Sequence, residues 1–133
     1  LQAYWTIAKP VSAIRVGVRY INHIIVDEPK AQPAKYFRNI SSEPDPIRGA
    51  LRNFVHRIEF VDENNRKSIV THATLVAPKT DMTLFLLDID TVWDHGPIAD
   101  LEAALAKAQT LHELEGKIFE DLITDECRRL FDA

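Results

Sequence analysis

The run MTLFLLDIDTVW, residues 82–93, is the most apolar stretch of the chain and ends in charged residues. Because successive side chains of a β-strand point to opposite faces, this run presents two rows of side chains. One row holds Phe85, Leu87, Ile89 and Trp93, and the other holds Leu84, Leu86, Asp88 and Asp90. The first half is apolar in both rows, which predicts the central strand of a sheet that is covered, or nearly covered, on both sides.

Three other segments are predicted to be strands of the same antiparallel sheet: residues 12–27, 50–61 and 67–76. Segment 12–27 alternates regularly up to Tyr20, with Arg15 and Arg19 in one row. Beyond Tyr20 the alternation blurs, which favours a bulge or a change of partner strand. Residues 1–8 are apolar and aromatic enough to form a helix end or a short strand.

The loop DENNR, residues 62–66, sets the register of the hairpin that joins the second and third of these segments. With an even number of loop residues, His56 would meet Ala73, and the apolar residues of both strands would share one face. His72 would then lie on the opposite face, across from Arg57. We therefore expect the two histidines to be on different sides of the sheet.

The period of the apolar residues becomes helical after Pro97. The apolar stripe consists of Leu101, Leu105, Ala108, Leu111, Ile118, Phe119 and Leu122. Glu113, Glu115, Lys117 and Asp121 fall largely outside it. Thr124 is a suitable N-cap for a short last helix over 125–131. The predicted fold is a single α+β domain over residues 1–133: an antiparallel sheet of about four strands with a C-terminal helical segment packed on one face.

Composition excludes several classes of protein. A length of 133 residues suits one domain that buries about two thirds of its unfolded surface. The net charge of −4 argues against a general nucleic-acid surface or an anionic-membrane surface. No apolar run approaches the length of a membrane span.

The single cysteine, Cys127, cannot form an internal disulfide, so we expect a cytoplasmic protein. The proline-rich segment 28–49 is where a mobile loop is expected.

Four charged residues form the first candidate site. If segments 12–27 and 82–93 are neighbours in the sheet, Arg15, Arg19, Asp88 and Asp90 share one face. They could form a cross-strand ladder of ion pairs, with a structural role. They could also form a polar groove that binds a phosphate or a metal ion. The sequence favours the structural interpretation.

Other chemical motifs are weak. Residues 88–92, DIDTV, fit the D-x-D-x-[TV] pattern of haloacid-dehalogenase-like phosphatases, in which the two aspartates act around magnesium. In that family the motif opens the fold and a long βα series follows, whereas about forty mostly helical residues follow here. The five histidines show no close ligand spacing such as H-x-x-x-H. The sequence therefore predicts no metal site, no cofactor and no catalytic residue.

Three motifs carry a resemblance to a known family. GVRYIN (17–22), LLDIDTVW (86–93) and LHELEGKIFEDLITDECRRLF (111–131) together resemble a sporadically distributed family of uncharacterised prokaryotic conserved hypothetical proteins. In its members, strands like GLRYINRI and LLDIDVF and a tail like LHELKNRIFEALLTDKARELF recur in this order. Members are typically about twice this length, so the resemblance implies that this chain, which begins at Leu1, is the C-terminal half of such a protein. It implies no catalytic residue.

Two hypotheses for function follow, and a third is weaker. The leading one is a non-enzymatic binding or assembly module, which pairs as a homodimer through the exposed sheet or with its own N-terminal half. The rival is an enzyme or ligand-binding site for phosphorylated or nucleotide substrates, built on Asp88 and Asp90 with Arg15 and Arg19. The third, against the acidic balance, is nucleic-acid binding through five arginines: Arg15, Arg19, Arg38, Arg48 and Arg52.

Overall fold

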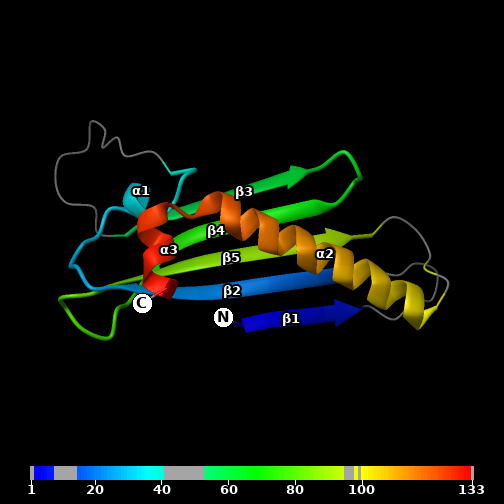
Figure 1. Cartoon of the computed structure of the whole chain (residues 1–133), viewed down its shortest axis with the longest axis horizontal. Helices are drawn as coiled ribbons and strands as arrows, with labels where there is room; N and C mark the ends of the chain where they lie inside the picture. Colours follow the sequence, from blue (N-terminus) through cyan, green and yellow to red (C-terminus); the bar gives the residue numbers. More distant parts are fainter. Residues whose placement is uncertain (1, 8–14, 41–52, 95–97, 99, 133) are drawn as a thin grey trace.

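The computed structural model describes residues 2–7, 15–40, 53–94, 98 and 100–132, with the backbone alone for residues 2–7 (Figure 1). Five antiparallel strands form one sheet in the order β1-β2-β5-β4-β3. The strands are β1 (Gln2–Ile7), β2 (Val16–Val26), β3 (Val55–Val61), β4 (Lys67–Leu75) and β5 (Thr83–Trp93). The helices are α1 (Pro33–Tyr36), α2 (Leu101–Leu122) and α3 (Asp125–Asp132). The predicted α+β class is confirmed, and residues 2–7 add a fifth strand.

The most apolar run forms the central strand, as predicted. β5 pairs with β2 without interruption, from Val16 opposite Trp93 to Val26 opposite Thr83. The bulge expected after Tyr20 is therefore wrong. The alternation only blurs in the sequence because Asn22 occupies a buried position, where its side-chain amide donates to the Leu87 carbonyl at 3.2 Å.

Helix α2 crosses one face of the sheet diagonally, and α1 and α3 lie on the same side (Figure 1). We call this side the inner face. Its core contains Phe85, Leu87 and Ile89 of β5, packed against residues such as Phe37 and Ile123. The start of α2 is fixed by Asp100, whose Oδ1 accepts the Ala103 N–H at 2.8 Å. No helix in the described part of the chain is long and apolar enough to cross a membrane.

The hairpin between β3 and β4 has a different register from the predicted one. Its loop contains an odd number of residues, because Asn65 takes the left-handed conformation (φ 59°) and closes a three-residue loop. The Asp62 side chain stabilises this loop by accepting the Arg66 N–H at 2.9 Å. His56 consequently lies directly opposite His72, and both face the helices. The expectation that His72 lies on the other face is wrong.

The buried stripe of α2 also differs from the predicted one. It runs through Ala104, Ala108, Leu111 and Glu115, so Glu115 is inside it. Leu101 and Leu105 are 65% and 51% exposed. The cause is visible in Figure 1, where the first turns of α2 extend beyond the ends of the strands. There the helix has little sheet to cover.

The described part of the proline-rich segment is tied to the C-terminal helices. Phe37 forms an isolated β-bridge with Ile123. On either side of that bridge, the Arg38 N–H donates to the Leu122 carbonyl at 2.8 Å and the Thr124 N–H donates to the Tyr36 carbonyl at 3.0 Å. Residues 41–49 of the predicted mobile loop lie outside the described residues.

Candidate functional site: the outer face of the sheet

The face opposite the helices, the outer face, carries the predicted site. Strand register assigns to it Arg19, Ile21, His23 and Ile25 of β2, Leu84, Leu86, Asp88 and Asp90 of β5, Lys67, Ile69, Thr71, Ala73 and Leu75 of β4, and Val55, Arg57, Glu59 and Val61 of β3. No described helix covers this face. Ile25 is 51% exposed, and Leu84 and Leu86 are half-buried, so the cover expected over both sides of β5 is not supplied by the described elements.

Arg19 and Asp88 form a two-pronged ion pair on this face. Arg19 Nε donates to Asp88 Oδ1 at 3.0 Å, and Nη2 donates to Oδ2 at 2.5 Å. The register partner of Arg19 is Asp90, so the pair with Asp88 is a diagonal one. The Asp88 side chain is 13% exposed and that of Arg19 is 49% exposed. The planar guanidinium fits a carboxylate in this two-pronged geometry.

Asp90 lies beside this pair, and its surroundings act on its pKa in opposite directions. Burial raises the pKa of its carboxyl, the charge of Asp88 adds to that effect, and the charges of Arg19, Arg15 and Arg57 oppose it. Arg15 is exposed and directly precedes β2. The structure thus brings the four predicted residues together on one face.

Sequence reasoning missed a further cation, Arg57 of β3. In the observed register Arg57 faces Thr71, which in turn faces Asp88, so the three residues form one row across the sheet. The predicted hairpin register placed Arg57 across from His72, which hid this relation. The correct loop length would have revealed it.

The ion pair between Arg19 and Asp88 limits what this cluster can bind. The guanidinium of Arg19 is already engaged by Asp88 and does not form an open anion receptor. Both aspartates lie within a paired strand, on a face that no described helix covers, rather than at the end of a strand. Within the described residues no three histidine, cysteine or acidic side chains are grouped as metal ligands.

Two histidines lie under the helices without a site around them. His72 is fully buried, and neither ring nitrogen has a hydrogen-bond partner. Its ring meets the Phe37 ring edge-on, with centroids 4.7 Å apart. Burial, with a smaller contribution from His56, lowers the pKa of His72 to about 4. Such a group is a neutral core residue rather than an acid–base catalyst.

Glu115 is another residue that sequence reasoning placed wrongly, since it is fully buried between α2 and β5. Its Oε1 lies 3.2 Å from the Thr91 hydroxyl, which also lies 3.2 Å from the Val18 carbonyl oxygen. A hydroxyl has one proton to donate. If Thr91 donates it to Val18, Glu115 must itself be protonated to complete the second bond. Burial also raises the pKa of Glu115 to about 9, which favours the neutral carboxylic acid and is compatible with that donation.

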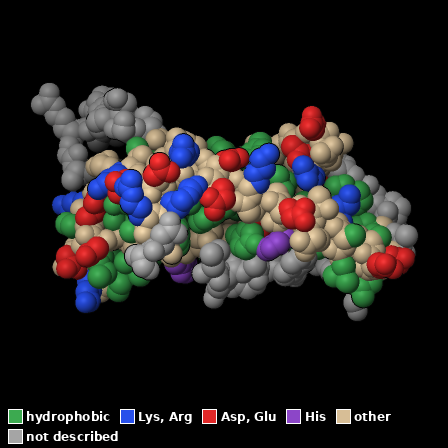
Figure 2. Space-filling model, in the orientation of Figure 1, with side chains coloured by type: hydrophobic (Ala, Val, Ile, Leu, Met, Phe, Trp, Pro, Cys, Tyr) green, Lys and Arg blue, Asp and Glu red, His purple; other side chains and the backbone are tan. Residues whose placement is uncertain are grey.

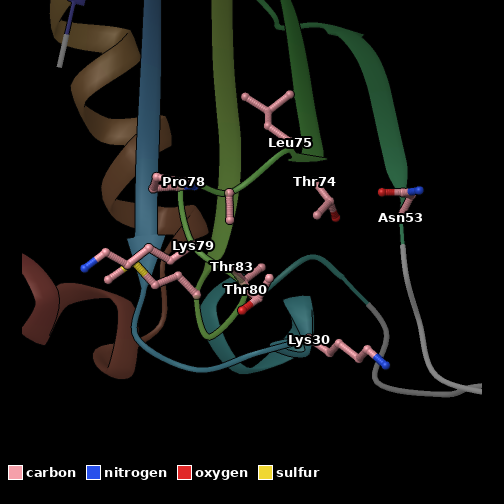
Figure 3. A pocket seen from close by; sticks show the side chains of 10 residues that line it. Lys30, Asn53, Thr74, Leu75, Pro78, Lys79, Thr80 and Thr83 are labelled. Atoms are coloured by element: carbon pink, nitrogen blue, oxygen red, sulfur yellow. The ribbon is translucent and has the colours of Figure 1, made fainter.

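A shallow pocket lies at the end of the sheet where β4 turns into β5 (Figure 3). Its volume is about 360 Å³, and its polar lining includes Lys30, Lys79, Thr80 and Asn53. In Figure 3 the Lys30 side chain extends away from Thr80 and Thr83. The polar groups of this pocket do not converge on one point.

The helix-covered side shows no surface of a single charge sign. In Figure 2 the lysines and arginines alternate with aspartates and glutamates over that side of the molecule. Ion pairs such as Arg128–Glu120 at 2.7 Å and Lys35–Glu28 at 3.1 Å account for part of this mixture. This distribution gives a nucleic-acid backbone no continuous basic track.

Comparison with known proteins adds no assignment: no family model, no curated protein and no solved structure matches this chain.

Proposed function

We propose that this chain is a non-enzymatic assembly module that forms a homodimer through the exposed part of its sheet. One observation carries the proposal: β3 is the last strand of the sheet, and none of its residues is buried. Its four exposed large apolar residues are Val55 at 75%, Val61 at 59%, Phe60 at 39% and Ile58 at 37% exposure. More than half of the residues in this seven-residue strand thus expose apolar side chains to water.

Burial of this surface would supply the driving force for association. Removing apolar area from water contributes roughly 25 cal/mol per Å². Exposed apolar edge strands are also sites where chains pair with one another. The family resemblance implies an N-terminal half as an additional partner, and this stays a prediction.

The test is the oligomeric state of the chain. Sedimentation velocity over a wide concentration range is expected to show a reversible dimer, and a monomer at the highest concentration would overturn the proposal. Val55→Asp is expected to shift the equilibrium toward monomer. Leu101→Asp is the matched control, because Leu101 is similarly exposed but lies on α2. Equal effects of the two substitutions would contradict a role for the sheet.

The rival function is a site for a phosphate or nucleotide ligand on Asp88 and Asp90 with Arg15 and Arg19. It is supported by the position of these residues on one face, which no described helix covers, and by the arginine charges that act on Asp90. Thermal melting with inorganic phosphate, magnesium and a nucleotide panel distinguishes it. A ligand at a hundred times its dissociation constant stabilises the fold by about 2.7 kcal/mol. A stabilisation that Asp90→Asn abolishes would favour the rival.

A further inference from the structure

The free edge of β3 presents a defined set of backbone groups. The Thr74 N–H donates to the Phe54 carbonyl, and the Asp62 N–H donates to the Arg66 carbonyl, each at 3.0 Å. In an antiparallel pair these exchanges recur at every second residue. The even-numbered residues of β3 therefore direct their backbone groups toward β4. The odd-numbered residues, Val55, Arg57, Glu59 and Val61, direct theirs toward the free edge.

We infer that this edge pairs with the same edge of a second copy, antiparallel, about a two-fold axis at Ile58. The inference rests on the proposed homodimer and specifies its strand and register. In this register Ile58 meets the partner's Ile58 and Arg57 meets the partner's Glu59. The outward-directed odd residues then face one another and exchange backbone hydrogen bonds, which joins the two sheets into one.

Charge selects this register over its neighbours. A two-fold axis at Arg57 or at Glu59 would place that residue opposite its own copy, and like charges directly opposite each other are destabilising. An axis at Ile58 makes two Arg57–Glu59 pairs and overlaps the whole of VHRIEFV. Glu59 already accepts Lys67 Nζ at 3.2 Å from the side of β4, so a guanidinium from the free edge would approach from the opposite side.

Side-chain faces agree with the same register. Val55 would meet the partner's Val61 on the outer face, beside the charge pairs. His56 would meet the partner's Phe60 on the inner face, beside the two copies of Ile58. The exposed apolar residues of β3 would thus gain apolar or aromatic neighbours, while its two charges gain opposite charges.

Charges on edge strands usually protect a sheet from unwanted pairing. This protection arises because like charges repel each other when two edge strands meet. Arg57 and Glu59 have opposite signs and lie symmetrically about Ile58, so they attract rather than repel in an antiparallel self-pair. This arrangement favours pairing with a second copy over pairing with an arbitrary strand.

Cysteine cross-linking tests the axis. Opposed residues of a non-hydrogen-bonded antiparallel pair have Cα atoms about 4.5 Å apart, which suits a disulfide. Ile58→Cys is therefore expected to form a covalent dimer with oxidised glutathione. Phe60→Cys is the matched control, because Phe60 lies on the same strand and face with similar exposure. Its two copies would be four residues out of register, roughly 14 Å apart.

The native thiol does not interfere with this experiment. Cys127 is buried, and burial raises its pKa to about 11, so it stays protonated and shielded. Cross-linking of Ile58→Cys but not of Phe60→Cys is the expected result. Equal cross-linking of both, or of neither in a chain that is dimeric by sedimentation, would overturn the register while leaving the homodimer intact. A wild-type monomer would overturn both.

Charge reversal provides a second, reversible test. Arg57→Glu or Glu59→Arg alone turns two attractive cross-strand pairs into two repulsive ones, and about a tenfold rise in the dimer dissociation constant is expected. The double variant restores opposite charges and is expected to recover most of the lost affinity. Failure of the double variant to recover affinity beyond either single variant would contradict the pairing.

Discussion

The two faces of the central strand β5 give a carboxyl group two different environments. On the inner face Glu115 meets Thr91 under α2, and burial raises the pKa of its carboxyl group to about 9. On the outer face Asp88 accepts hydrogen bonds from the guanidinium of Arg19. The strand is the same in both cases, so the difference lies in the partner of each carboxyl group and in its burial.

The largest expected effect comes from Glu115→Gln, which replaces the acid by a neutral amide of similar shape. The folded state keeps the Glu115 proton up to a pKa of about 9, whereas the unfolded chain loses it near 4.5. The folded state binds the extra proton between these values, so the contribution of Glu115 to stability falls as pH rises from about 4.5 to about 9. Urea unfolding at a series of pH values is expected to show this slope in the wild type and not in the variant.

The gain from Glu115→Gln at pH 8 is expected to be at most about 5 kcal/mol, because pH 8 lies about 3.5 units above the unfolded pKa and one pKa unit corresponds to about 1.4 kcal/mol. The control is Glu113→Gln, on the same helix but exposed, which should leave the slope unchanged. A wild-type stability that is flat between pH 7 and 9 would show that Glu115 is charged in the folded protein. The contrast between the two faces would then be wrong.

A second test concerns His72, the base that the inner face also keeps neutral. Its pKa is lowered from 6.5 to about 4, so the unfolded chain binds the extra proton between these values. The stability contribution is present above pH 6.5 and is lost as pH falls toward 4. His72→Phe retains an aromatic ring beside Phe37. It is expected to reduce the free energy of unfolding that is lost between pH 6.5 and pH 4 by on the order of 2 kcal/mol.

Chemical unfolding between pH 4 and 7 measures this effect. His23→Gln is the control, because His23 is exposed on the outer face and should leave the acid slope nearly unchanged. An equal change in slope from both substitutions would mean that the inner face does not exclude water from His72. Together with Glu115, His72 is expected to confine maximal stability to weakly acidic pH.

Alternation along the chain was sufficient to predict the central strand and the charged row on its outer face. The prediction that Arg19 shares a face with Asp88 and Asp90 needs only the two-residue period and the adjacency of β2 and β5. The two-residue period is a local signal, whereas the adjacency of the two strands was a condition of the prediction that the structure meets. The helical period after Pro97 similarly predicted a helical segment on one face, which is confirmed.

Three features could not be read from the pattern for physical reasons. The β3–β4 register depends on one left-handed residue, Asn65, which shifts every partner by one and moves His72 to the inner face. The sequence does not distinguish a protonated glutamate from a charged one, so Glu115 was assigned to solvent. Leu101 was assigned to the core because its spacing is correct, although the sheet ends before it.

The smallest expected effect is the coupling between Arg19 and Asp88, and it tests whether the outer face is open to water. A double-mutant cycle with Arg19→Gln and Asp88→Asn, measured by urea unfolding of the monomer at low concentration, should give about 0.2–1 kcal/mol, as for other exposed pairs. Added salt should reduce the coupling further by screening. Salt should leave the effect of Glu115→Gln unchanged, because that residue is buried and neutral. A coupling of several kcal/mol that resists salt would instead indicate that the pair is covered in solution.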